Sequence, residues 1–358
     1  MYYLYPDYYK KFHCIADKCI DTCCAEWQIV IDDESLEKYR NYKGDYRQTL
    51  CQNIDWEEGV FGHNKRGKCA FLRDDDLCDM YIHMGEDSLC TTCREYPRHT
   101  EEFENLREIT LSLSCPEVAK IVMNTTEPIT FVTKEDETDE CYEEFDYFLF
   151  SELEDVREEM IRIIQDRNVN IRDRIDKILQ ISVSVQRHYD AGSLISWNEF
   201  EQSDRVCVEN EYELFERLFL FLFEEFEILY PQWAEVLVES RLFLFGEGKK
   251  VFEQNKEEFE TWWNTSNLTP LDIVLEQLVV YFISVYLLGA VYDENILGKV
   301  DACIGHTIEI YLLLLGRWLK HGELAMDDVI EVVYRYSREI EHSDENLERA
   351  EMLNWFAR

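Results

Sequence analysis

The sequence predicts a mainly α-helical protein, in which a loop-rich, cysteine-rich N-terminal domain precedes an all-helical C-terminal domain. Ten of the 13 cysteines lie before residue 116. Short segments interrupted by Gly, Asp and Asn dominate residues 1–120, whereas apolar residues at helical spacing dominate the later part. We therefore predict a cysteine-rich metal domain over residues 1–123, an acidic linker over 124–142 and a helical domain over 143–358.

Helical periodicity and capping residues predict the individual elements. Thr269 before Pro270 and Ser343 before two acidic residues are typical of helix N-caps. The linker holds one candidate strand, over residues 129–133. We expect helices over residues 33–42, 115–123, 143–166, 171–190, 210–229, 231–245, 250–264, 270–291, 296–320 and 326–341, and a further one after Ser343.

The charge and the apolar runs limit the possible partners. The chain has 36 basic and 75 acidic residues, and its formal charge of −39 repels phosphate backbones. We therefore expect no nucleic-acid partner, but an attraction for lysine-rich protein segments. The acidic surface also keeps an aromatic-rich protein soluble. The N-terminus lacks the pattern of a signal peptide, and the apolar run 278–291 is shorter than the roughly 18 residues of a membrane span.

These features predict a cytoplasmic protein without a membrane partner, and in the cytoplasm clustered cysteines more often bind metal than form disulfides. Short spacings such as C-x2-C at 90–93 and C-x3-C-C at 19–24 bring thiolates together at little cost in loop entropy. Cys51 stands apart from the pattern. The predicted metal ligands are Cys14, Cys19, Cys23, Cys24, Cys69, Cys78, Cys90, Cys93 and Cys115.

The type of metal follows from the same pattern. One C-x2-C pair, adjacent Cys23 and Cys24, and no histidine ligand pattern favour an iron–sulfur cluster over zinc, which stays the alternative. Nine thiols exceed the four that one cluster needs, so either some are structural or a second metal is present. The competing interpretation is that these cysteines are small buried hydrophobic residues.

Four ordered segments carry a resemblance to a known family. They are "FHCIADKCIDTCCAEWQIVID" (12–32), "GKCAFLRDDDLCDMY" (67–81), "GEDSLCTTCREYPR" (85–98) and "LSLSCPE" (111–117). Together they resemble the flagellin lysine-N-methylase family, which is related to cysteine-rich proteins thought to chelate zinc or iron. The resemblance implies a protein lysine N-methyltransferase that uses S-adenosylmethionine and holds a [4Fe-4S] cluster. Flagellin is the substrate that names the family, and whether it is the substrate here is open.

The donor site has to differ from that of an ordinary doubly wound methyltransferase. The chain has only 13 glycines and no G-x-G-x-x-G motif, and "FGEGKKVF" (245–252) follows a helical pattern and predicts a turn. A C-x3-C-x2-C radical signature is also missing, which favours polar methyl transfer. The cysteine-rich domain is therefore the expected donor site.

Several side chains beside the cysteines are candidates for the chemistry. Arg94 and Arg98 are predicted to bind the carboxylate of the donor, unless they pair with some of the acidic residues. Tyr96 is the candidate to accept or relay the amine proton, unless it serves packing alone. Trp27, Glu26 and Asp79 are candidates for a surface that receives the lysine cation.

Two functional hypotheses thus remain from the sequence. The first is a cluster-containing protein lysine N-methyltransferase that acts on a lysine-containing protein. The second is a non-enzymatic zinc- or iron-binding interaction protein whose acidic helical domain docks a basic partner. The presence of an iron–sulfur cluster and the methylation of a protein substrate would distinguish them.

Overall fold

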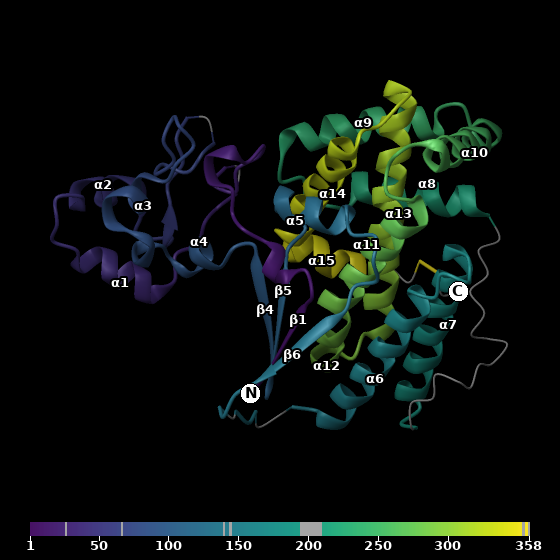
Figure 1. Cartoon of the computed structure of the whole chain (residues 1–358), viewed down its shortest axis with the longest axis horizontal. Helices are drawn as coiled ribbons and strands as arrows, with labels where there is room; N and C mark the ends of the chain where they lie inside the picture. The colour runs from purple at the N-terminus through teal and green to yellow at the C-terminus, as the bar shows by residue number, and fades with distance from the viewer. Residues whose placement is uncertain are drawn as a thin grey trace.

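The computed structural model describes residues 1–25, 27–65, 67–138, 140–142, 145–193, 210–352 and 355–356. It confirms a mainly α-helical protein whose C-terminal region is all-helical (Figure 1). A small lobe built from short helices and loops lies at one end, and the long helices form a larger body at the other. We call residues 14–95 the cysteine lobe and the long helices, from residue 147 onward, the helical body.

The N-terminal third contains only short elements. Its helices are α1 (Asp33–Asn41), α2 (Arg47–Asn53), α3 (Asp79–Met84), α4 (Thr91–Glu95) and α5 (Pro116–Met123), with 3-10 turns η1 (Tyr9–Lys11), η2 (Ala16–Lys18) and η3 (Glu86–Ser88). Its strands are β1 (Tyr2–Pro6), β2 (Ile54–Asp55), β3 (Val60–Phe61), β4 (Arg98–Phe103), β5 (Leu106–Leu111) and β6 (Phe131–Glu135).

The helical body follows the predicted helices closely. It contains α6 (Tyr147–Ile164), α7 (Ile171–Asp190), α8 (Glu211–Glu224), α9 (Pro231–Phe245), α10 (Lys249–Thr265), α11 (Leu271–Tyr286), η5 (Leu287–Gly289), α12 (Ala290–Asp293), α13 (Ile296–His321), α14 (Met326–Glu341) and α15 (Asp344–Glu351). The expected helix over 270–291 is divided by a 3-10 turn. Gly248, with φ of +80°, lies in the predicted turn before α10 and adopts a backbone conformation that glycine accommodates without strain.

One of the two predicted N-caps is confirmed and the other is wrong. The Ser343 hydroxyl accepts a hydrogen bond from the Asn346 backbone N–H at 3.2 Å and caps α15. The Thr269 hydroxyl instead donates to the Met123 carbonyl at 2.9 Å, and α11 begins after Pro270 without a side-chain cap. The Thr269 hydroxyl, which was expected to cap α11, thus makes a tertiary contact with the end of α5 instead.

A four-stranded sheet, of which the sequence predicted only one strand, joins the two ends of the N-terminal third. The order is β4-β5-β1-β6, in which β1 pairs parallel to β5 and antiparallel to β6. Strand β6 begins two residues later than the candidate strand of the predicted linker. Glu108 on β5 forms a two-pronged ion pair with Arg157 on α6, with both distances 2.6 Å, and this buried pair attaches the sheet to the helical body.

Two hydrophobic cores divide the molecule. The smaller core unites the cysteine lobe, with buried residues from Ile29 to Cys90. The larger core combines residues of the sheet and α5 with the helical body, and α13 lies at its centre. Leu312, Leu314 and Leu315 on α13 have 0% exposure. Each such leucine contributes about 1.5–3 kcal/mol through burial.

Two helical segments are long and apolar enough to cross a membrane by length and composition. They are Leu271–Asp293 and Ile296–His321, and in each of them 78% of the most apolar window is buried inside the protein. The length of the apolar segment was underestimated from the uninterrupted run 278–291, because the apolar segment also includes earlier residues that alternate with polar ones. Burial of this kind is what central helices of a helical body show.

Candidate metal centre and adjoining site

Five of the predicted ligands lie in or against the small core of the cysteine lobe, and we call them the lobe thiols. Cys69 and Cys90 belong to the small core, and the other three pack against it. The Cys69 N–H donates to the Cys24 carbonyl at 2.8 Å, across the bridge between Ala25 and Lys68. A second bridge pairs Leu72 with Cys78, close in sequence to Cys69. The lobe thiols are Cys24, Cys69, Cys78, Cys90 and Cys93.

The remaining four predicted ligands lie where the cysteine lobe meets the helical body, and we call them the junction thiols. Cys115 is buried at the start of α5, in the larger core. The Arg338 guanidinium on α14 donates to the carbonyl of Asp21 at 2.9 Å and to that of Ser114 at 3.0 Å. One side chain therefore holds the loop of Cys19 and Cys23 beside Cys115. The junction thiols are Cys14, Cys19, Cys23 and Cys115.

Electrostatics reflects the same grouping. Burial, with smaller contributions from the thiols of Cys24, Cys78 and Cys90, raises the pKa of the Cys69 thiol to about 12. Burial likewise raises the pKa of Cys115 to about 11, with contributions from Cys19 and Cys14. A thiol with such a raised pKa stays protonated at neutral pH unless a cation compensates its charge.

The donor set suits a thiophilic metal. In the described ranges, no group of three or more His, Cys, Asp or Glu side chains is already arranged to hold a metal ion. Each group nevertheless offers at least four thiols on neighbouring loops, and thiolates are the ligands of zinc and iron–sulfur sites. Backbone N–H groups of Met80 and Tyr81 donate to Cys78, and those of Glu117 and Val118 donate to Cys115. Such hydrogen bonds stabilise a thiolate, and so the chemistry of these residues fits a zinc ion or an iron–sulfur cluster.

The three predicted catalytic and donor-binding residues, Arg94, Tyr96 and Arg98, occupy alternate positions in the sequence but have different surroundings. The Arg94 side chain is exposed and bonds to Glu95 at 2.9 Å. Arg98 donates to the Tyr9 hydroxyl at 3.0 Å and lies over the rings of Tyr9 and Phe12. Both arginines thus have partners within the protein. Their role in donor binding stays a prediction.

Tyr96 starts a chain of hydrogen bonds that reaches the helical body. Its hydroxyl lies 3.1 Å from the Ser114 hydroxyl, which lies 2.7 Å from that of Ser112. The Ser112 hydroxyl donates to the Glu341 carboxylate on α14 at 2.6 Å, and Tyr281 donates to the same carboxylate. Burial raises the pKa of Glu341 and that of Tyr96, the latter also through the nearby thiols of Cys115 and Cys23.

An aromatic cluster lies next to this hydrogen-bond chain. The Trp27 ring stacks on His342 with centroids 4.9 Å apart, and the Tyr96 ring lies 5.7 Å from Trp27. Burial lowers the pKa of His342 to about 4, so this imidazole is neutral at pH 7, and its buried Nδ1 has no hydrogen-bond partner in the part of the chain that the structure describes. Trp27 was a sequence candidate for a cation-receiving surface, whereas Glu26 lies outside the described residues.

Residues of α14 and its C-terminal end complete this site, and the sequence pattern did not predict them. Ser337, Arg338, Glu341 and His342 lie more than 200 positions from the nine predicted ligand cysteines in the sequence. The sequence signal was slight, because a buried arginine and glutamate in a helix look like members of a solvated face. Asp79, another candidate for the cation-receiving surface, accepts a hydrogen bond from Tyr46.

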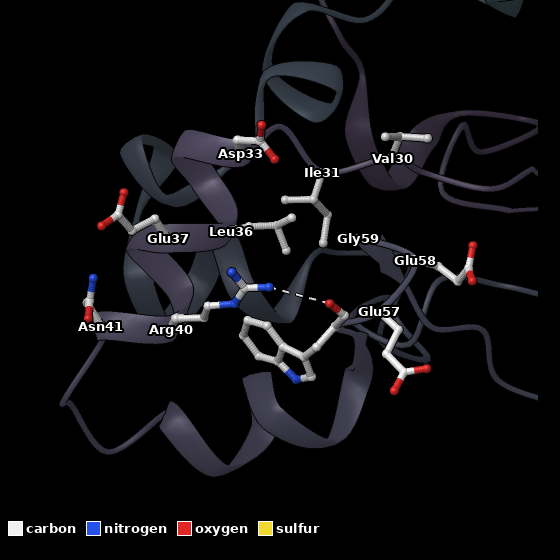
Figure 2. A pocket seen from close by; sticks show the side chains of 11 residues that line it. Val30, Ile31, Asp33, Leu36, Glu37, Arg40, Asn41, Glu57, Glu58 and Gly59 are labelled. Carbon is white, nitrogen blue, oxygen red and sulfur yellow. Dashed lines mark hydrogen bonds between the residues drawn. The ribbon is translucent and has the colours of Figure 1, made fainter.

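Two cavities flank the cysteine-rich region. The larger, about 710 Å³, lies on the cysteine lobe over Ile31 and Leu36, with a mostly acidic rim that Arg40 interrupts (Figure 2). None of the predicted site residues lines it. The smaller, about 270 Å³, lies between the junction loop and the helical body. Its lining includes Ile20, Asp21, Tyr230, Trp233, Arg335 and Arg338.

The fold and the thiol groups together define a helical protein with an N-terminal lobe that carries clustered cysteines. The family model for the FliB lysine N-methylase C-terminal domain matches residues 157–356, more than half of the 358 residues. The chain therefore belongs to the FliB lysine N-methylase family. No solved structure is significantly similar to it.

Curated relatives agree with this assignment. The chain is 30% identical over 128 residues to a lysine-N-methylase of Salmonella typhimurium, an alignment that covers 33% of this chain and 32% of the relative. It is equally identical over 128 residues to the flagellar biosynthetic protein FliU of Salmonella muenchen, with 33% of this chain and 75% of the relative covered. The match therefore spans about a third of the lysine-N-methylase.

Proposed function

We propose that this chain is a protein lysine N-methyltransferase that transfers a methyl group from S-adenosylmethionine to lysine side chains of a protein in the cytoplasm. Membership of the FliB lysine N-methylase family and the name of the Salmonella typhimurium relative support this activity. The formal charge of −39 supports a lysine-rich substrate. The name of the FliU relative makes flagellin the first substrate to test.

The observation that carries the proposal is the hydrogen-bond chain from Tyr96 to Glu341. A lysine ammonium, with a pKa near 10.4 in water, has to lose a proton before its nitrogen can attack a methyl group. The amine nitrogen then bonds to the methyl carbon while the carbon–sulfur bond breaks and its electron pair stays on sulfur. The hydrogen bonds give the released proton a path from Tyr96 through Ser114 and Ser112 to the carboxylate of Glu341.

Glu341 is suited to receive this proton. Burial raises its pKa, and a carboxylate with a raised pKa is a stronger base than one in water. The neighbouring aromatic cluster of Trp27, Tyr96 and His342 supplies apolar faces that favour a methylated ammonium and exclude water. Proton acceptor and cation-binding surface thus adjoin each other beside the junction thiols.

The smaller cavity is the best location for the donor. Its aromatic residues Tyr230 and Trp233 suit the adenine ring, and Arg335 suits the carboxylate of the amino acid part. Asp21 connects the cavity wall to the loop of Cys19 and Cys23. Binding by Arg94 and Arg98 is the competing prediction, and Arg335→Ala against Arg94→Ala separates the two through the Kd of the donor.

The cysteine-rich region would hold the iron–sulfur cluster that the family resemblance implies. The ligands would come from the nine predicted cysteines, which lie in the two groups described above. When bound, the cluster would keep the loops around Tyr96 in place and offer iron to the donor. The protein's own residues perform the proton transfer and the orientation of the amine.

The decisive experiment measures methyl transfer directly. The full chain, purified anaerobically with its metal, is incubated with flagellin and S-adenosylmethionine, and intact mass and peptide mass spectra are recorded. We expect mass increases of one methylene unit per methyl, located on lysines, and none when the donor is omitted. An unmodified substrate, with metal-replete protein and with other lysine-rich proteins also unmodified, would refute the enzyme and favour the interaction protein.

A further inference from the structure

The thiols of the adjacent residues Cys23 and Cys24 hydrogen-bond to each other, and beyond this contact their neighbours differ. The Cys23 thiol is close enough to those of Cys14 and Cys115 for them to act on it electrostatically. Cys24 instead lies opposite Cys69 in the short antiparallel bridge, and it acts on Cys78 and Cys93. The boundary between the two thiol groups therefore passes between two consecutive residues.

Each group also belongs to a different part of the fold. The lobe thiols lie in or against the small core, whose buried residues run from Ile29 to Cys90. Cys115 belongs to the larger core, and Arg338 of α14 fastens the loop of the junction thiols to it. A single tetrahedral ion or cubane takes about four thiolates that converge on one point. Five of the nine thiols lie in or against the small core, whereas Cys115 lies in the larger core, and so the nine do not form one such set.

We propose that the chain holds two separate thiolate-ligated metal centres, one in the cysteine lobe and one at its junction with the helical body. The lobe centre uses Cys24, Cys69 and two of the other three lobe thiols, and the junction centre uses Cys14, Cys19, Cys23 and Cys115. Cys23 and Cys24 each serve a different centre. This explains why two adjacent cysteines, which fit one tetrahedral ion poorly, occur in the chain.

The chemistry of both centres is that of soft metals. Both ligand sets consist of thiolates, which select zinc or iron–sulfur clusters over hard cations. The two centres have different structural consequences. The lobe centre stabilises a lobe with a small core of its own, whereas the junction centre fixes that lobe against α5 and α14, beside Tyr96. The inference does not depend on methyl transfer, because its readout is metal content.

The test compares the two adjacent cysteines with one partner from each group. Iron, zinc and acid-labile sulfide per chain are measured, with the absorption spectrum, in full-length protein purified anaerobically. The single variants are Cys23→Ala, Cys115→Ala, Cys24→Ala and Cys69→Ala. Cys51→Ala, an exposed cysteine of the same lobe, is the control. Sulfide together with iron identifies a cluster, and zinc without sulfide identifies an ion.

We expect Cys23→Ala and Cys115→Ala to lose one metal complement, and Cys24→Ala and Cys69→Ala to lose the other. The double variant Cys23→Ala/Cys115→Ala then loses no more than either single variant, whereas Cys23→Ala/Cys69→Ala loses all bound metal. The control retains everything. Equal and complete loss in all four single variants, or double variants that do not follow this grouping, overturns the proposal.

A second measurement covers variants that fail to fold. Native mass spectrometry of the unmodified chain weighs the bound inorganic material directly. Two centres give the added mass of two ions, two clusters or one of each. An added mass that one ion or one cluster accounts for, or no added mass, overturns the proposal.

Discussion

The Arg338 guanidinium lies 2.9 Å from the Asp21 carboxylate, and the arginine side chain is only 4% exposed. The same guanidinium binds two backbone carbonyls, one on each side of the junction. The position of the junction thiols relative to the Tyr96–Glu341 hydrogen-bond chain therefore depends on this one residue of α14.

Arg338→Ala should lower the free energy of unfolding substantially. The substitution leaves a partly buried carboxylate and two carbonyls without their donor, and the loss of one partner from a buried pair costs about 3–5 kcal/mol. Since Asp21 is 24% exposed, we expect the lower end of this range. Denaturant unfolding of both proteins measures it.

The matched control for Arg338→Ala is Arg162→Ala. Arg162 pairs with Glu159 on the surface of α6, and its side chain is 65% exposed. Such surface pairs contribute about 0–1 kcal/mol, so the control should unfold almost like the unchanged protein. Equal effects of the two substitutions would show that the junction contact is not stabilising.

Asp301 on α13 should make stability depend on pH. The residue has 0% exposure, its Oδ1 has no hydrogen-bond partner in the described part of the chain, and burial raises its pKa from 3.8 to about 7. The folded state therefore keeps a proton that the unfolded state releases. The contribution of Asp301 to stability is therefore greatest below about pH 4 and falls as the pH rises toward 7, in total by up to about 4 kcal/mol.

Unfolding experiments from pH 4 to pH 8 on the unchanged protein and on Asp301→Asn isolate this contribution. Other carboxyls with raised pKa values, such as Glu341, contribute equally to both proteins. The difference between the two curves should therefore change between pH 4 and pH 7. A difference that is constant with pH would contradict the raised pKa of Asp301.

Tyr96→Phe should reduce methyl transfer and leave the metal in place. Phenylalanine keeps the ring against Trp27 but removes the hydroxyl that contacts Ser114. Loss of proton transfer by a positioned side chain lowers kcat by about 10²–10⁴-fold. Glu341→Gln, which cannot accept a proton, should have an effect of the same kind and flatten the acidic limb of the pH–rate profile.

The control for this prediction is Tyr292→Phe, because the Tyr292 hydroxyl donates to the Glu102 carbonyl away from the thiols. Its kcat should stay unchanged. If Tyr96→Phe retains full kcat, Tyr96 serves packing alone.

Removal of metal should loosen the cysteine lobe before the helical body. The lobe has a small core, and metal ligation and folding are coupled in such lobes. After chelation, amide hydrogen exchange should accelerate over residues 14–95 and stay slow over α13. Unchanged protection of the lobe would show that its apolar core suffices.

The amino-acid sequence alone indicated the helical body well. The predicted bounds of α7, α9 and α14 agree with the structure, because apolar spacing within a helix and the terminal Pro231 are local properties. Three of the four strands of the sheet were missed. Strand β4, with the sequence RHTEEF, is mostly polar and so lacks the alternation of a typical strand. The pairing of β1 with β5 and β6 joins segments that are far apart in the sequence, which a local pattern does not reveal.

The sequence by itself determined which atoms are available: nine clustered thiols and a tyrosine between two arginines. Only the tertiary structure decided their grouping: it divided the thiols into two groups between Cys23 and Cys24, and it connected Tyr96 to Glu341 through Ser114 and Ser112. The physical reason is that sequence spacing constrains only the distance between residues that are close along the chain. The side chain that completes a site comes from whichever helix the hydrophobic core packs against it, and here that helix is α14.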